Sequence, residues 1–288
     1  MSALRNDWEA REAFHTLLLA HLPASYRAPA EGRPAPVRLK GGVNLRLYHA
    51  SPRYSEDMDF DVTRERGPQF VAQLRKVLME NSPFRAALLK QGIEDLDVSA
   101  IDGGGPNTAG FKQKVRLIRG GVKLPTKVEG SYREETLPQE AVGLPIPEVF
   151  VRAYGLPEAS IVSSYPAPVA LWQKALALSR RDPPQTRDIY DLQHLLEIHP
   201  SALVEAGCDL IRSRMTAEQR AQAASTVSQF TQDQFENQVV QFLPEPMRVA
   251  ARAEWGERQS RGWEWLASLA EEQISQTLNT PTPEGHHV

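Results

Sequence analysis

The chain of 288 residues contains a single cysteine, Cys208, and this scarcity excludes two kinds of stabilising chemistry. One cysteine cannot form an intramolecular disulfide, and it cannot supply a metal site built from several thiolates. Such low cysteine use is typical of proteins in a reducing compartment, so we expect a cytoplasmic protein.

Long apolar runs are also scarce, which argues against a membrane protein. The N-terminal run "LLLA" at 17–20 is too short for a signal-peptide core or a membrane span, and Asp7, Glu9 and Glu12 precede it. We therefore expect an amphipathic first helix over about 6–22 and no membrane partner.

An excess of positive charge is missing as well. The chain has 33 Lys and Arg residues against 36 Asp and Glu residues, which gives a formal net charge of −3. Proteins that coat nucleic acid generically are usually strongly basic, so the balance argues against that function but allows a local basic groove. The length is sufficient for one large or two modest domains.

The spacing of apolar residues changes along the chain. Strand-like and helix-like segments mix up to about residue 145, and a period of 3.6 dominates beyond it. We predict an α+β fold, with a mixed or antiparallel sheet and the first helix in residues 1–150. An all-helical domain over 151–276 and a disordered tail over 277–288 follow. Gly120 and Gly121 predict a hairpin turn between two strands.

Three aspartates alternate with apolar residues in "YSEDMDFDV" at 54–62, namely Asp57, Asp59 and Asp61. A period of two is typical of a strand with one face toward a core. Two carboxylates at i and i+2 on one face can hold Mg²⁺ or Mn²⁺, and a solvated acidic turn is the structural alternative. We interpret Asp61 as a solvated residue near the strand end, outside the metal-binding pair.

A glycine pair, Gly41 and Gly42, stands between a predicted strand and a helix start in "LKGGVNLRL" at 39–47. Glycines there let the backbone approach a phosphate, and the helix N-terminus offers N–H groups and a positive dipole end. A tight turn without a ligand is the alternative. Because Asp57 follows closely in the chain, the two motifs together favour a site for a metal-bound phosphate. Glu129, in strand-like "TKVEGSYR", is a candidate third acid or simply an exposed glutamate.

Two charged residues of the C-terminal half lie within apolar helical stripes. They are Lys174 in "WQKALAL" and Asp191 in "RDIYDL". Since an unpaired buried charge is costly, each should be paired or functional. The pattern therefore predicts either a structural ion pair between two helices or a site in which Lys174 meets a triphosphate and Asp191 orients it. Asp188 is interpreted as a helix N-terminal charge that answers the dipole.

Basic residues concentrate between Phe111 and Val128, where no acid occurs. Lys112, Lys114 and Arg116 alternate and should share one strand face. This face, together with basic residues of the helical half, predicts a track for a nucleic-acid backbone, and a solvated strand face is the alternative. The helical residues concerned are Arg180, Arg181 and Arg187.

Four segments, taken in order, resemble the motifs of the AbiEii/AbiGii toxin family of nucleotidyltransferases. They are "LKGGVNLRL", "RYSEDMDFDV", "KVEGSYR" and "LWQKALALSRRDPPQTRDIYDLQHLL". The family comprises toxins of bacterial type IV toxin–antitoxin and abortive-infection modules. The resemblance covers about residues 36–200, and it implies a polymerase-β-like nucleotidyltransferase fold with a helical C-terminal domain.

The resemblance also implies a role for each matching position. The catalytic set is Asp57, Asp59, Lys174 and Asp191, and the metal ligands are Asp57, Asp59 and Glu129. The nucleotide-binding set is Gly41, Gly42, Asn44, Ser55 and Lys174. Many relatives carry Ser or Thr directly after the glycines, whereas this chain has Val43. Asn44 or a backbone N–H would then have to replace the missing hydroxyl.

The expected activity is Mg²⁺-dependent transfer of a nucleotide from an NTP, and the resemblance implies RNA as the acceptor, with the 3′ end of tRNA as the leading candidate. Such a modification would inhibit translation and growth, and a cognate antitoxin is an expected partner. Two alternatives stay open at this point. The enzyme could modify a small-molecule or protein hydroxyl, or the chain could be a non-catalytic nucleotide-binding module, which Val43 favours.

Overall fold

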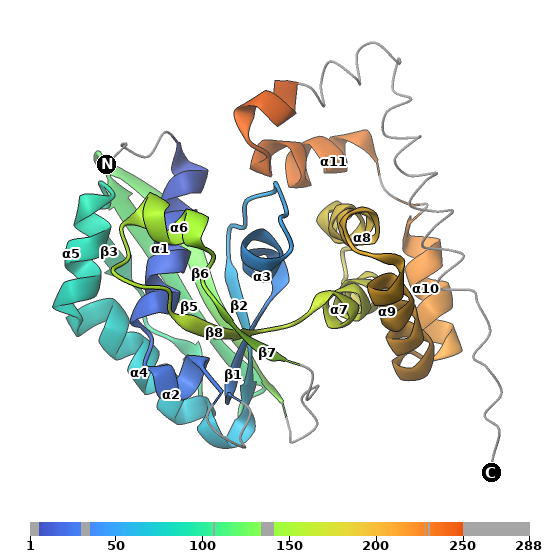
Figure 1. Cartoon of the computed structure of the whole chain (residues 1–288), viewed down its shortest axis with the longest axis horizontal. Coiled ribbons are helices and arrows are strands. Elements are labelled where there is room, and N and C mark those ends of the chain that lie inside the picture. The colour runs from blue at the N-terminus through green and yellow to red at the C-terminus, as the bar shows by residue number, and fades with distance from the viewer. Residues whose placement is uncertain are drawn as a thin grey trace. The chain divides into compact units, whose positions relative to one another are not determined.

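The computed structural model describes residues 6–29, 35–105, 107–133, 141–227, 229 and 231–249. By its contacts the chain forms two compact units (Figure 1). The first, called the sheet unit, comprises the described residues of 1–50 and 54–166. The second, called the helical unit, comprises those of 51–53 and 167–288. The chain therefore passes between the units three times, and a three-residue loop segment, Ser51–Arg53, packs with the helices that follow much later.

A mixed sheet of eight strands, counted over the described residues, forms the centre of the sheet unit. The order is β3-β5-β6-β2-β1-β8-β7, and β4 pairs with β5. β2 runs parallel to β6 and β1 runs parallel to β8, whereas the other neighbours are antiparallel. The strands are β1 (Val37–Lys40), β2 (Met58–Thr63), β3 (Asp95–Val98), β4 (Asp102–Gly103), β5 (Gly110–Arg119), β6 (Val122–Arg133), β7 (Val142–Pro145) and β8 (Ile161–Ser164).

Helices pack on this sheet around one hydrophobic core. They are α1 (Asp7–His21), α2 (Ala24–Arg27), α3 (Gly41–Tyr48), η1 (Arg64–Arg66), α4 (Gly67–Glu80), α5 (Ser82–Lys90) and α6 (Glu148–Tyr154). Phe14 of α1, Phe70 of α4 and Phe84 of α5 are fully buried in the core with Phe60 of β2. Burial of such side chains, each of which stabilises the fold by about 1.5–3 kcal/mol, fixes which face of the sheet is covered.

The alternation along β2 decides where the acidic residues lie. Met58, Phe60 and Val62 are buried in the core. Because neighbouring side chains of a strand point to opposite faces, Asp59 and Asp61 lie on the other face, here called the polar face. Lys127 and Glu129 of β6 share this face, since Val128 between them belongs to the core.

Several predictions of local structure are confirmed. The first helix, the strand–glycine–helix turn at 37–48 and the hairpin at Gly120 and Gly121 all form. The boundary between halves differs from the one expected at 150. The sheet unit continues to Pro166, because β8 pairs with both β1 and β7.

The helical unit is built from α7 (Ala167–Arg180), α8 (Thr186–Ile198), α9 (Ser201–Arg214), α10 (Ala217–Val227), α11 (Gln232–Gln238) and η2 (Val240–Phe242). α7 packs against α8, α9 and α10, and α11 packs against α8. These helices agree with the predicted change of period. The end of the predicted helical domain, residues 250–276, and the predicted tail 277–288 lie outside the described residues.

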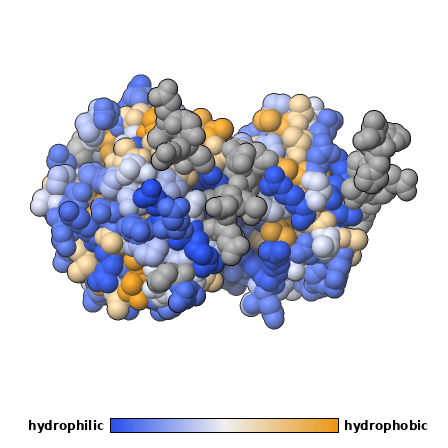
Figure 2. All heavy atoms as spheres, turned by 90° about the horizontal axis from the view of Figure 1, so that it is seen from below, coloured by the Kyte–Doolittle hydropathy of each residue, from blue (hydrophilic) through white to orange (hydrophobic). Residues whose placement is uncertain are grey.

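The view in Figure 2 shows mainly hydrophilic residues with scattered apolar ones. In the described part of the chain, no helix has the length and apolar character needed to cross a membrane.

Candidate functional site

The glycine turn joins β1 directly to α3 and brings the backbone against an aspartate. Gly41 has φ of +69°, a conformation that glycine adopts readily and other residues rarely do. A Cβ placed on Gly41 would lie 2.6 Å from Oδ2 of Asp59. The N-cap of α3, Lys40, makes no side-chain capping bond, and the positive dipole end of the helix lies at this turn, where it would favour an anion.

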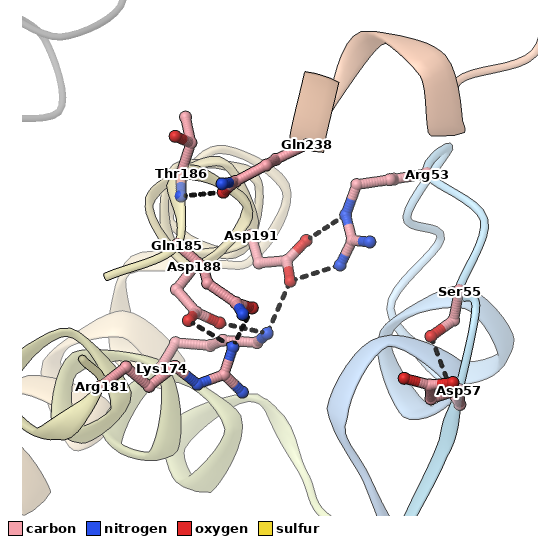
Figure 3. A network of polar contacts seen from close by, with 10 residues as sticks. All are labelled: Arg53, Ser55, Asp57, Lys174, Arg181, Gln185, Thr186, Asp188, Asp191 and Gln238. Carbon is pink, nitrogen blue, oxygen red and sulfur yellow. Dashed lines mark hydrogen bonds and ion pairs between the residues drawn. The ribbon is translucent and has the colours of Figure 1, made fainter. Parts of the chain in front are cut away.

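The acids predicted as metal ligands gather at the same end of the polar face. Asp59 of β2 is the register partner of Glu129 on the parallel strand β6, which places their side chains on one face of neighbouring strands about 4.8 Å apart. Asp57 directly precedes β2, and Ser55 Oγ donates to its carbonyl oxygen at 2.8 Å (Figure 3).

A lysine of the same face contacts two of these acids. Lys127 Nζ lies 2.9 Å from Asp57 Oδ2 and 3.3 Å from Glu129 Oε1. Lys112 Nζ approaches the same Glu129 oxygen at 3.4 Å. Burial would lower the pKa of Lys127, but Asp57 and Glu129 raise it above its usual value, so the ammonium form is favoured. The position between Asp57 and Glu129 is thus held by a cation of the protein itself.

The oxygen ligands of Asp57, Asp59 and Glu129 are of the kind that a divalent metal prefers, although these side chains do not form a preassembled cluster. Among the described residues, no group of three or more His, Cys, Asp or Glu side chains is arranged to hold a metal ion. Oδ1 of Asp57 is nevertheless buried without a hydrogen-bond partner in the described part of the chain. Burial raises the pKa of Asp57, and Lys127 opposes that shift. A hard cation would satisfy this orphaned oxygen, so the residues fit Mg²⁺ or Mn²⁺.

The prediction for Asp61 was wrong, because this residue is buried rather than solvated. Its side chain is only 4% exposed, and Oδ1 lies 2.7 Å from Lys40 Nζ. Tyr165 donates its hydroxyl to Oδ2 at 2.9 Å. Burial and the Asp61 charge raise the pKa of Tyr165, which keeps this donor protonated. Asp61 therefore holds the side chain of Lys40, the residue directly before the glycine turn.

Two residues after the glycines are engaged inside the protein. Val43 is buried in the core cluster, so its side chain serves packing. Asn44 is also buried, and its amide Nδ2 donates to the carbonyl oxygen of Tyr165 at 3.0 Å. The side chain of Asn44 thus does not offer the donor expected to replace a hydroxyl, and the backbone N–H groups of α3 are left for that task.

The helical unit contains a series of alternating charges, in which Arg53, Asp191, Lys174 and Asp188 are buried and Arg181 is exposed (Figure 3). Arg53 binds Asp191 through two bonds, Nε to Oδ1 at 3.0 Å and Nη2 to Oδ2 at 2.7 Å. Lys174 Nζ lies 2.6 Å from Asp191 Oδ2 and 2.9 Å from Asp188 Oδ1. Arg181 Nη1 is 3.0 Å from the other oxygen of Asp188.

These contacts decide the charge of Asp191 and correct the interpretation of Asp188. Burial would raise the pKa of Asp191, but Arg53 and Lys174 hold it well below its usual range. Asp188 is fully buried and pairs with two cations, so it is not merely a first-turn charge that answers the helix dipole. The contact of Lys174 with Asp191 is the ion pair between two helices that was one of the two predicted alternatives, and a role in the reaction stays a prediction.

The basic residues lie in separate parts of the fold. Lys112, Lys114 and Arg116 do share one face of β5, where Phe111, Val115 and Leu117 occupy the buried face. Lys112 contacts Glu129, and Arg116 contacts Asp97 at 3.1 Å. In the helical unit, Arg180 ends α7 with an exposed side chain and Arg187 is half-buried in α8. Their contact with nucleic acid stays a prediction.

Sequence reasoning missed three residues at these sites: Lys40, Arg53 and Lys127. Lys127 shares its parity with Glu129 in "TKVEGSYR", so a two-residue spacing could have identified it. Lys40 directly precedes the glycine pair. Arg53 reaches Asp191 across 138 positions of sequence, and no local pattern announces that contact.

Comparison with known proteins identifies the family of the chain. The family model described as "Nucleotidyl transferase AbiEii toxin, Type IV TA system" matches residues 26–267. Comparison with curated proteins gave no match. Among solved structures, MenT4, a nucleotidyltransferase toxin of Mycobacterium tuberculosis H37Rv, aligns with a TM-score of 0.51 at 18% identity, over 94% of this chain and 91% of that one. JHP933 from Helicobacter pylori aligns with a TM-score of 0.47 at 14% identity, over 96% of each chain.

The likeness to MenT4 concerns the fold, which is that of a polymerase-β-like nucleotidyltransferase, as predicted. The family model spans the glycine turn, the acidic strand and the charged chain of the helical unit. The protein is therefore a member of the AbiEii family, the nucleotidyltransferase toxins of type IV toxin–antitoxin systems.

Proposed function

We propose that the protein transfers a nucleotide from an NTP to an RNA hydroxyl in a Mg²⁺-dependent reaction, with the 3′ end of tRNA as acceptor. Addition there would prevent aminoacylation or peptide transfer and so inhibit translation. A cognate antitoxin is the partner that type IV family membership implies.

The proposal rests on one observation, the close approach of the carboxylates to the glycine turn. Gly41 has a glycine conformation and no side chain, which lets Asp59 approach the start of α3 closely, and Asp59 stands beside Glu129. Phosphate oxygens and acidic side chains repel each other unless a cation lies between them. An N–H-rich helix start beside clustered carboxylates therefore suits a metal-bound triphosphate.

The roles of the residues follow from their chemistry. Asp57, Asp59 and Glu129 would hold Mg²⁺, which when bound lowers the pKa of the acceptor hydroxyl and stabilises charge on the α-phosphate. Glu129 or Asp59 accepts the hydroxyl proton, and the oxygen attacks the α-phosphorus. The bond from that phosphorus to the β-phosphate bridging oxygen breaks, and pyrophosphate leaves. Lys174 stabilises the negative charge of the leaving group, and Asp191 orients Lys174.

Two features support RNA as the acceptor. The exposed face of β5 carries Lys112, Lys114 and Arg116 in a row, as a backbone-tracking surface requires. The toxin family to which the chain belongs also calls for a target whose modification stops growth. A small-molecule or protein hydroxyl would not need such a row, so it is the alternative outcome of the test.

The test is a labelling reaction with purified protein, Mg²⁺ and total bacterial tRNA. Each of the four NTPs is supplied in turn with a radioactive α-phosphate, beside an Asp57→Ala variant. We expect label in the RNA with at least one NTP, its loss in the variant, and release after 3′-terminal nuclease digestion. Label from no NTP would refute the RNA acceptor. Label that enters the protein itself would favour a protein hydroxyl.

A further inference from the structure

Five charged residues of the helical unit are linked in one continuous series, in which four are buried and Arg181 is exposed. Their order is Arg53, Asp191, Lys174, Asp188 and Arg181, and each contacts the next within 3.0 Å. Arg53 comes from the loop after α3, whereas the others belong to α7, α8 and the turn between them. Arg53 precedes Asp57 by four positions in the chain.

Burial makes the contacts of Arg53 energetically important. The side chain of Arg53 is 3% exposed, and that of Asp191 is fully buried. Their two parallel bonds form the fork geometry that fixes a carboxylate in one orientation. Arg53 binds both carboxylate oxygens of Asp191, and Lys174 Nζ forms an ion pair with one of them, Oδ2. The orientation of Asp191, and through it that of Lys174, thus depends on the guanidinium.

The balance of charge also depends on Arg53. The five residues comprise three cations and two anions, so this series of side chains carries one excess positive charge. Without the two arginines, the single positive charge of Lys174 would face two negative carboxylates, Asp188 and Asp191. The net charge there would be negative, and the lysine would attract a substrate anion only weakly. Arg53 takes up the charge of Asp191, and Arg181 does so for Asp188, which leaves the ammonium of Lys174 with an effective positive charge.

We propose that Arg53 is a positioning residue that acts through Asp191, holding Lys174 in place and keeping it attractive to the phosphate groups of a nucleotide. This inference rests on the proposed function for the identity of the anion, a triphosphate. It goes beyond that function because it assigns a role to Arg53, a loop residue ahead of the acidic strand that positions Asp191 and Lys174.

A binding experiment without metal tests the inference apart from catalysis. The probe is inorganic tripolyphosphate, titrated calorimetrically into wild type, Arg53→Met, Lys174→Met and the double variant. We expect each single substitution to weaken binding about tenfold, as is usual when a charged hydrogen-bonding partner is lost. The double variant should bind no more weakly than Lys174→Met, because Arg53 acts through Lys174. Arg152→Met, which breaks a solvent-exposed pair with Glu148, is the control.

Each result decides the question. Additive losses in the double variant, unaltered binding in Arg53→Met, or no tripolyphosphate binding by wild type would overturn the inference. Should Arg53→Met fail to fold, Arg53→Lys retains the charge and loses the fork. We expect that variant to fold and to bind severalfold more weakly than wild type, and wild-type binding by it would overturn the positioning role.

The kinetic readout separates this inference from the proposed function. If wild type transfers label, Arg53→Lys should raise KM for the NTP more than it lowers kcat, since the lost interaction is already made in the ground state. A fall in kcat alone would contradict the inference. If wild type transfers no label at all, the proposed RNA-transfer activity fails, while the tripolyphosphate cycle still decides the role of Arg53.

Discussion

Gly41 meets two separate demands, a left-handed backbone and close approach of a carboxylate. Its φ is +69°, and an added Cβ would lie 2.6 Å from Asp59 Oδ2. Gly41→Ala should therefore cost about 1–2 kcal/mol of unfolding free energy through backbone strain, and it should also displace Asp59. We expect nucleotide transfer to fall by about a hundredfold, because a displacement near 1 Å at a reacting group has that effect.

Gly155 offers a matched control for that prediction. Its φ is +65°, and nothing lies within 4 Å of an added Cβ. Gly155→Ala should show similar loss of unfolding free energy in urea titrations with full transfer activity. Equal activity losses in the two variants would show that strain alone, and not the contact with Asp59, explains the effect at Gly41.

Lys127 competes with any metal for Asp57 and Glu129. Its ammonium contacts both carboxylates in the structure, and its side chain is 37% exposed. Lys127→Met should therefore tighten Mn²⁺ binding in the absence of nucleotide. The expected gain is about fivefold, since a partly exposed ion pair contributes at most about 1 kcal/mol. Titration of free Mn²⁺ by electron paramagnetic resonance measures it directly.

Lys114→Met is the control for this titration, because Lys114 of β5 is the register partner of Lys127 on β6 and so lies on the same face of the sheet. It should leave the affinity for Mn²⁺ within about twofold of wild type, because an exposed surface charge contributes little. Weaker Mn²⁺ binding by Lys127→Met than by this control would mean that Lys127 supports the metal site rather than occupying it.

At the scale of elements, strand β5 provides the test of the RNA acceptor. Lys114 and Arg116 are exposed on it, although Arg116 contacts Asp97, and Lys112 contacts Glu129. Lys114→Glu combined with Arg116→Glu should reduce label transfer to tRNA by at least about tenfold at physiological salt. The slope of log K against log salt concentration should fall in magnitude by about 1–2, because about two phosphate contacts are lost.

The control carries the same change of charge on helices instead of the strand. Lys76 of α4 and Lys90 of α5 are both exposed. Lys76→Glu with Lys90→Glu should keep tRNA labelling and its salt dependence near wild type. If both pairs lower labelling equally, net charge rather than the β5 face governs RNA affinity.

Elements with a strong period were predictable from the sequence. The alternation in 54–62 and the glycine pair at 41–42 identified β2 and the start of α3, and parity placed Asp59 and Glu129 on equivalent faces. The period of 3.6 identified α7 and α8 with Lys174 and Asp191. Local pattern is informative here because burial of one face dictates residue choice along the whole element.

Other features depend on contacts distant in sequence and could not be predicted. β8 has only four residues, and its place beside β1 becomes apparent only when the sheet is assembled. Asp61 has the sequence context of a solvated strand end, yet Lys40 and Tyr165 cover it. Arg53 is a single charge in a loop whose partner lies on α8. In each case a tertiary contact, absent from any local window, overrides the local expectation.

At the scale of the whole molecule, the two units carry buried groups that titrate in different pH ranges. In the sheet unit, His15 Nε2 lies 3.0 Å from Thr126 Oγ1. Since Thr126 donates its hydroxyl to the Glu56 carbonyl oxygen, His15 is the donor in this contact. Burial, assisted by Arg11, lowers the pKa of His15 to about 3 from an ordinary 6.5. In the helical unit, Arg53 and Lys174 overcome burial and hold the pKa of Asp191 below 3.8.

The directions of the two pKa shifts determine the order in which the two units lose stability as the pH falls. Between pH 6.5 and 3 the unfolded state protonates His15 while the folded state does not, so stability of the sheet unit falls as pH falls. The loss has a limit of about 1.4 kcal/mol per pH unit for one group. Asp191 stabilises the helical unit fully above its unfolded pKa, and that contribution is lost only as pH falls below 3.8 toward its lower folded pKa.

Acidification from pH 6.5 to 4.5 should therefore weaken the sheet unit first. Hydrogen exchange followed by mass spectrometry, corrected for intrinsic exchange rates, should show protection of α1 and β6 peptides falling by up to about tenfold per pH unit. Peptides of α7 and α8 should keep their protection. His15→Gln, which retains a donor for Thr126 but does not titrate, should remove most of this dependence. Equal losses in both sets of peptides would mean instead that the two units unfold as one cooperative body.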